Sequence, residues 1–203
     1  MRNNKGFTLM ELVAAIFIGG MVTAALVLVW KVSSVQTSQN QRQTIIRNQL
    51  SNFQRQFYKD FYESDVITYP TTNTSNASTM ILAGIKKTSS FNLFTEKFTS
   101  DVANTTAFYY CKSSNVSTTI LRYTESITTS GSLDISDYGS DKLSACQSGG
   151  KVVLENFSLT NSSIEGSLYN LQGRVQRTFD TAAGSTPINI TVDEKLSNPG
   201  GFL

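Results

Sequence analysis

A single carboxylate, Glu11, lies near the start of a long apolar run that extends from Phe7 to Trp30. The only other polar side chains in this run are those of Thr8 and Thr23. An acidic side chain within a membrane-spanning helix costs about 2.5–3.5 kcal/mol on insertion scales, so we expect Glu11 to have a role other than insertion. A carboxylate in a low-dielectric setting stays ionised only beside an opposite charge. This pattern therefore predicts that Glu11 forms an ion pair with a positively charged group.

The lack of histidine excludes several kinds of catalytic site. With no histidine in the chain, Ser-His-Asp and Cys-His nucleophile systems, histidine zinc sites and histidine general bases cannot form. The sequence also has no Gly-x-x-x-x-Gly-Lys loop that would cradle the phosphates of a nucleotide. Its acidic residues are too scattered to nominate a pair for carboxylate-based hydrolysis. We therefore expect neither a catalytic site nor a cofactor.

An acidic cluster at Asp134, Asp137 and Asp141 is the candidate metal site. Oxygen ligands at short intervals are typical of loops that bind calcium. The spacing departs from an Asp-x-Asp-x-Asp-Gly loop, because Tyr138 occupies a ligand position and no bidentate glutamate follows at the expected distance. We expect a solvated turn here, with calcium binding as the alternative.

The two cysteines, Cys111 and Cys146, follow the apolar run. If this part of the chain is exported, its compartment permits oxidation. A bridge would close a loop of about 35 residues, which the chain-entropy estimate values at roughly 4 kcal/mol. We expect a disulfide, and the alternative is two free buried thiols.

The apolar run predicts one membrane-spanning helix. At 1.5 Å per residue, residues 7–30 reach about 36 Å, enough for a hydrocarbon core of about 30 Å. Arg2 and Lys5 precede the run and Lys31 alone directly follows it, so the positive-inside rule predicts a cytoplasmic N-terminus and an external remainder. A secretory signal peptide is one alternative, but the run is too long and no A-x-A-like site ends it. An ordinary uncleaved anchor is the other, and it leaves Glu11 unexplained.

Residues 31–69 predict a helical stalk that continues the membrane helix. No glycine or proline interrupts the chain from Met21 to Tyr69. Apolar residues recur there at spacings of three and four, which places them on one helical face: Ile46, Leu50, Phe53, Phe57 and Phe61. We expect this stripe to pack against the chain's own C-terminal domain, and the alternative is a groove that binds a partner.

Residues 70–203 predict a β-rich globular head. Short runs rich in β-branched and aromatic residues alternate with polar loops, which is typical of an antiparallel sheet: residues 80–82, 107–110, 119–123, 152–154 and 188–192. The expected fold class is therefore α+β, with the long N-terminal helix packed against a C-terminal antiparallel sheet.

The segment Lys5-Gly6-Phe7-Thr8-Leu9-Met10-Glu11 resembles the N-terminal signature of type IV pilins and of the pseudopilins of type II secretion. In that family a prepilin peptidase cuts after the glycine and the new N-terminal residue is methylated on its amine. The resemblance implies a leader at residues 1–6, cleavage between Gly6 and Phe7, and N-methylation of Phe7. The glutamate of the family falls on Glu11, which implies an assembly contact with the Phe7 amine of a neighbouring subunit.

The resemblance implies a structural subunit of a type IV pilus or a secretion pseudopilus. The implied partners are prepilin peptidase, other pilin or pseudopilin subunits and the inner leaflet of the membrane before assembly. The implied location is the bacterial inner membrane, with a periplasmic or extracellular head, and then the assembled fibre. Major pilins commonly carry a proline in the apolar segment where this chain has Gly19-Gly20. We therefore expect a minor subunit, and the strand pattern over residues 108–157 is similar to that of J-type minor pseudopilins.

A pilus-mounted binding module, such as an adhesin or a DNA-uptake competence pilin, is the second functional class. A DNA-binding head would cluster Lys and Arg with aromatic platforms. Only Lys86-Lys87 and the pair Arg174 and Arg177 approach this pattern. The formal net charge of +2 equals the contribution of Arg2 and Lys5 in the leader, so the rest of the chain carries no net charge. We therefore favour the structural role and expect no nucleic-acid partner.

Overall fold

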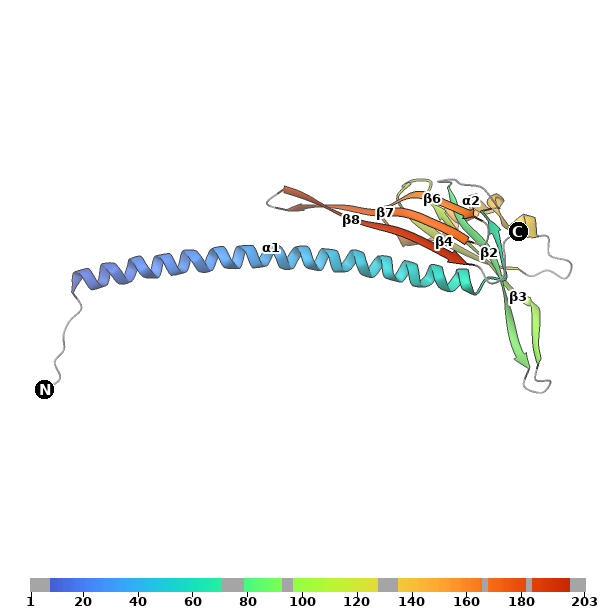
Figure 1. The fold of residues 1–203 in the computed structure, drawn as a ribbon, viewed down its shortest axis with the longest axis horizontal. Helices are drawn as coiled ribbons and strands as arrows, with labels where there is room; N and C mark the ends of the chain where they lie inside the picture. Colours follow the sequence, from blue (N-terminus) through green and yellow to red (C-terminus); the bar gives the residue numbers. More distant parts are fainter. Residues whose placement is uncertain are drawn as a thin grey trace. The chain divides into compact units, whose positions relative to one another are not determined.

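A computed structural model describes residues 8–70, 79–92, 97–127, 135–165, 168–181 and 184–197. The chain divides into two compact units, residues 1–48 and residues 49–203. One helix, α1 (Leu9–Tyr62), forms the first unit and also contributes its last turns to the second (Figure 1).

The first unit is a helix with an apolar surface. α1 is long and apolar enough to cross a membrane, and the most apolar stretch of the helix is not buried within the protein. The hydroxyl of Thr23 donates to the carbonyl oxygen of Gly19 at 2.8 Å, so this polar group is satisfied within the helix itself. An exposed apolar surface of this extent requires a membrane or other helices to cover it.

The second unit contains two antiparallel sheets. The five-stranded sheet has the order β1-β2-β3-β4-β5, with β1 (Val66–Tyr69), β2 (Met80–Asn92), β3 (Lys97–Lys112), β4 (Ile120–Ile127) and β5 (Lys151–Leu154). The three-stranded sheet has the order β6-β7-β8, with β6 (Phe157–Glu165), β7 (Leu168–Thr181) and β8 (Gly184–Ser197). Three short helical segments lie in the chain between β4 and β5: η1 (Ile135–Tyr138), η2 (Ser140–Lys142) and α2 (Leu143–Gly149).

An aromatic core joins the last turns of α1 to both sheets. The predicted apolar stripe is buried in the second unit at Leu50, Phe53, Phe57 and Phe61. The ring of Phe57 lies 5.0 Å from that of Tyr110 on β3 and 6.0 Å from that of Tyr169 on β7, measured between centroids. The hydroxyl of Tyr169 donates to the carbonyl oxygen of Ile81 on β2 at 3.0 Å, which links the two sheets. The expected α+β fold is therefore confirmed.

The predicted helical boundary at residue 69 is wrong, because α1 ends at Tyr62. The hydroxyl of Ser64 donates to the carbonyl oxygen of Phe61 at 2.6 Å and satisfies a carbonyl in the last turn. Residues 66–69 then form β1, the edge strand paired with β2. β-Branched side chains favour the strand here, and pairing with β2 provides the backbone partners that a continued helix would otherwise supply.

Candidate functional site

Thr8 and Glu11 form a reciprocal hydrogen-bonded cap at the start of α1. The backbone N–H and the hydroxyl of Thr8 donate to Oε2 of Glu11 at 2.9 and 3.1 Å. The backbone N–H of Glu11 lies 3.4 Å from the Thr8 hydroxyl oxygen. This is a capping box, which satisfies N–H groups that have no partner within the helix. Oε1 of Glu11 accepts no hydrogen bond from the described residues, so the carboxylate keeps one oxygen for a further partner.

The expected cleavage and methylation residues, Gly6 and Phe7, lie outside the described residues. Glu11 is exposed on the first turn of α1. The carboxylate therefore lies beside the N–H groups at the start of the helix.

A buried carboxylate, Asp60, connects α1 to the five-stranded sheet. Its side chain is only 1% exposed. It accepts hydrogen bonds from Nε and Nη2 of Arg122 at 2.6 and 3.0 Å, and from the hydroxyl of Tyr110 at 2.6 Å. The side-chain amide of Gln56 donates to the same carboxylate at 3.2 Å. The two-pronged Arg–carboxylate geometry fixes orientation as well as charge, so this network sets the position of the last turns of α1 on β3 and β4.

The pKa values in this network move away from neutral pH. Burial by itself would raise the pKa of Asp60, but hydrogen bonds from Arg122 and Tyr110 outweigh burial and lower it. Burial and the nearby Asp60 carboxylate raise the pKa of the Tyr110 hydroxyl. A general acid or base works best with a pKa near the operating pH. The network is therefore suited to holding the fold together and not to proton transfer.

A disulfide joins Cys111 on β3 to Cys146 on α2, with 6.3 Å between their Cα atoms. Both cysteines are fully buried, together with Tyr109 and Met80. The bridge attaches the short helix α2 to the five-stranded sheet.

The structure describes two of the three acidic residues considered for calcium. Asp137 lies in η1 and Asp141 in η2, and Asp134 lies outside the described residues. No group of three or more His, Cys, Asp or Glu side chains in the described part of the chain is arranged to hold an ion. The backbone carbonyl of Tyr138 accepts a hydrogen bond from Thr68 at 2.6 Å, so this oxygen is engaged within the fold.

One family model, the prokaryotic N-terminal methylation motif, matches residues 1–27. The chain carries the type IV pilin and pseudopilin signature. The matched residues include Gly6, Phe7 and Glu11, and they extend into the apolar part of α1. Comparison with curated proteins and with solved structures gives no match. The pilin signature implies a processed structural subunit, prepilin peptidase as the processing enzyme and other pilins as assembly partners.

Beside this signature, the structure adds residues that the sequence analysis did not single out. The partnership of Thr8 with Glu11 has a sequence signal, since Thr-x-x-Glu ahead of an apolar run is the capping-box pattern. Asp60 also has a signal, because it is a charged residue beside the aromatic stripe of a helix. Its partner Arg122 has none, since the two residues are 62 positions apart in the chain.

Proposed function

We propose that the chain is a minor pilin or pseudopilin, cleaved between Gly6 and Phe7 and assembled through α1 into a type IV pilus or a type II secretion pseudopilus. The observation that carries this proposal is the methylation motif over residues 1–27. The apolar surface of α1 supports it, since neighbouring helices in a filament core would cover that surface. The lack of a proline in the apolar segment, where Gly19-Gly20 stands instead, supports the minor role.

Before assembly, the protein is a single-pass protein of the inner membrane. The N-terminus lies in the cytoplasm, because Arg2 and Lys5 precede the apolar run. The head lies in the periplasm, a compartment that supports disulfides such as Cys111–Cys146.

Glu11 is the assembly contact in this proposal. Cleavage creates an amine on Phe7, and the Glu11 carboxylate of a neighbouring subunit is its anionic partner. The Thr8 cap occupies one carboxylate oxygen and leaves the other for that amine. Desolvation offsets much of the attraction between buried opposite charges, so the contact contributes more to the register between subunits than to raw stability.

Processing is tested by mass spectrometry of the assembled protein. In cells with an active prepilin peptidase, the mature chain should begin at Phe7 and carry one N-methyl group. Gly6→Val should leave Met1 in place, because the branched side chain disturbs the cleavage junction. An intact Met1 on assembled wild-type protein would refute the processing step.

The assembly contact is tested by co-purification with sheared filaments or with partner minor subunits. Glu11→Ala should insert and be cleaved but lose incorporation, and Glu11→Gln should show most of the same defect because it keeps size and loses charge. Thr23→Val is the matched control, since it also removes a polar group from the apolar run and should assemble normally. Wild-type incorporation of both Glu11 variants would contradict the proposed contact.

A further inference from the structure

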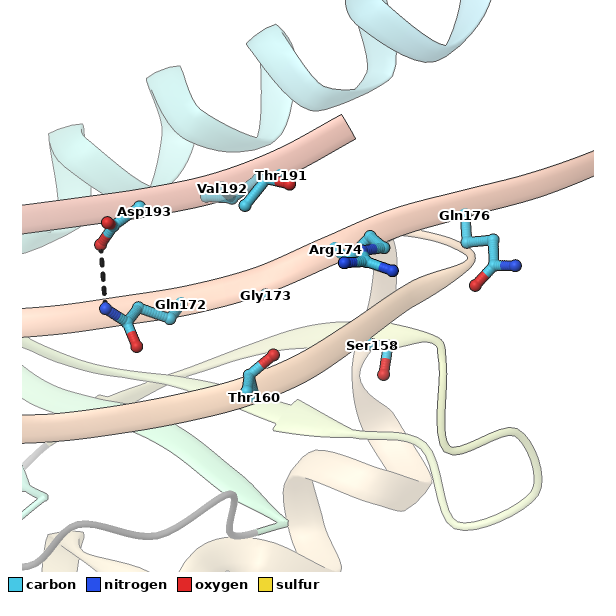
Figure 2. A pocket seen from close by; sticks show the side chains of 9 residues that line it. All are labelled: Ser158, Thr160, Gln172, Gly173, Arg174, Gln176, Thr191, Val192 and Asp193. Atoms are coloured by element: carbon cyan, nitrogen blue, oxygen red, sulfur yellow. Dashed lines mark hydrogen bonds between the residues drawn. The ribbon is translucent and has the colours of Figure 1, made fainter. Parts of the chain in front are cut away.

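The outer face of the three-stranded sheet contains a polar groove of about 470 Å³ (Figure 2). Pockets that hold small ligands enclose roughly 300–1,000 Å³, so the volume suits a short stretch of a polymer or one small molecule. Side chains from all three strands line it, among them Ser158, Thr160, Gln172, Arg174, Thr191 and Asp193.

An irregularity in β6 shapes this face of the sheet. Thr160 is the extra residue of an irregularity in the β6–β7 pairing, between Leu159 and Asn161. Such a bulge bends its strand, increases the local twist and re-aims side chains. The backbone of β6 therefore sets the position of Thr160 in the groove.

Arg174 is the cation of the groove. In the strand register it lies opposite Ser158 on β6 and Thr191 on β8, which are short and uncharged. Its neighbours on the same face of β7, Gln172 and Gln176, are neutral amides. Arg174 is exposed, and it makes no ion pair with any of the residues that the structure describes.

The one carboxylate in the groove, that of Asp193, makes no ion pair with Arg174. Asp193 accepts a hydrogen bond from the side-chain amide of Gln172 at 3.1 Å, drawn as a dashed line in Figure 2. The guanidinium of Arg174 therefore points to a negatively charged ligand, and its planar fork matches a carboxylate through two parallel hydrogen bonds.

We propose that this groove binds a carboxylate-bearing sugar chain, with Arg174 holding the carboxylate and the surrounding hydroxyl, amide and Asp193 groups bonding to the sugar hydroxyls. The inference does not rest on the proposed assembly role.

A sugar fits this lining better than a protein or a nucleic acid does. Protein interfaces have an apolar core, but the apolar residue in the lining, Val192, is buried and faces away from the groove. Non-specific nucleic-acid binding depends on several cations that contact phosphates, and this groove supplies a single arginine. The hydroxyl and amide side chains that line the groove both donate and accept hydrogen bonds, as the hydroxyls of a sugar do.

Each groove should bind weakly and a multivalent array strongly. No aromatic side chain lines the groove, so no ring is present there for a sugar to stack on. A polymer that engages several copies of the protein gains roughly 10²–10⁴-fold in apparent affinity without any new contact. The test must therefore use a polymeric probe and a surface that carries many copies.

The experiment measures polygalacturonate binding to the full-length chain in lipid nanodiscs, immobilised at high density on a biosensor, with empty nanodiscs as the blank. Wild-type protein should bind polygalacturonate and should lose binding when the carboxylates of the polymer are methyl-esterified. Arg174→Gln should weaken binding about tenfold or more, because a charged hydrogen bond is lost. Arg174→Lys should restore part of it, since it keeps the charge and loses the fork.

The matched control is Arg55→Gln, which removes an exposed cation from α1 and makes the same change in net charge. This variant should bind as the wild type does. The proposal is overturned if the wild type does not bind, if the esterified polymer binds equally, or if Arg55→Gln weakens binding as much as Arg174→Gln. Equal binding of polyaspartate would also overturn it, because recognition would then require only negative charge.

Discussion

Replacement of Asp60 by Asn removes the negative charge from the buried network that attaches α1 to the five-stranded sheet. Asn keeps the size of the side chain and can still bond to Tyr110, so the change is confined mainly to the charge. The substitution leaves the guanidinium of Arg122 without a negatively charged partner. The Arg122 side chain is 25% exposed. We expect the second unit to be destabilised as a whole, because the network joins the helix to β3 and β4.

The magnitude follows from the burial of the two partners. Loss of one member of a buried ion pair costs about 3–5 kcal/mol. Because the Arg122 side chain keeps partial contact with water, the lower end applies, about 3 kcal/mol. For a unit of this size each kcal/mol shifts the midpoint by about 2–4 °C, so Asp60→Asn should lower Tm by about 6–12 °C.

The effect should also depend on pH in a defined direction. The pKa of Asp60 is lowered in the folded protein. The ionised Asp60 carboxylate therefore contributes its full stabilisation of the fold above the unfolded pKa of about 3.9. This stabilisation is lost as the pH falls through the lower pKa of the folded protein. The stability gap between wild type and Asp60→Asn should be complete at pH 7 and should narrow below about pH 4.

The assay is thermal unfolding of the full-length chain in detergent, followed by the near-ultraviolet circular dichroism of the buried tyrosines. Asp141→Asn is the matched control, because Asp141 is exposed and the same chemical change there should cost less than about 0.5 kcal/mol. Arg122→Gln should also destabilise the protein, and the double variant should lose less than the sum of the two single losses, since both remove the same interaction. An Asp60→Asn protein with wild-type Tm, or strictly additive losses in the double variant, would refute this reasoning.

Three further outcomes are expected. Thiol reagents should fail to label the folded, exported protein without reductant, and ready labelling of both thiols would show that no bridge forms. Replacement of Cys111 and Cys146 together by serine should lower the free energy of unfolding by about 2–5 kcal/mol. Gly173→Ala should destabilise the protein by about 1–3 kcal/mol, because the added methyl group meets the ring of Phe157, and an unchanged Tm would mean that the strand shifts freely. Duplex DNA should bind the full-length chain only weakly at physiological salt, whereas sub-micromolar, salt-dependent affinity in a filter-binding assay would favour a DNA-uptake role.

Features that depend on neighbouring positions in the chain can be predicted from the sequence. The apolar run of α1 and its buried stripe follow from composition and from the 3.6-residue period of a helix. The bonding between Thr8 and Glu11 spans three positions, so the capping pattern is readable from the sequence as well. The methylation motif can also be read from the sequence, because it is carried by the contiguous residues 1–27.

The end of α1 and the strands β6 and β7 show where such prediction fails. β6 is rich in Ser, Thr and Asn, whose local preference does not distinguish a strand from a loop. Its place in the sheet comes from pairing with β7, and the strand formed by residues 66–69 likewise depends on pairing with β2.

The sequence by itself determined the anchor, the position of Glu11 within it and the α+β class, because each is encoded over a few consecutive turns or strands. Only the tertiary structure decided that Arg122 is the partner of Asp60 and that Ser158, Arg174 and Thr191 form one row across a groove. These residues are far apart in the chain, and strand order and register bring them together. A shift of one residue in register would turn each side chain to the opposite face of the sheet, so no local pattern can specify the groove.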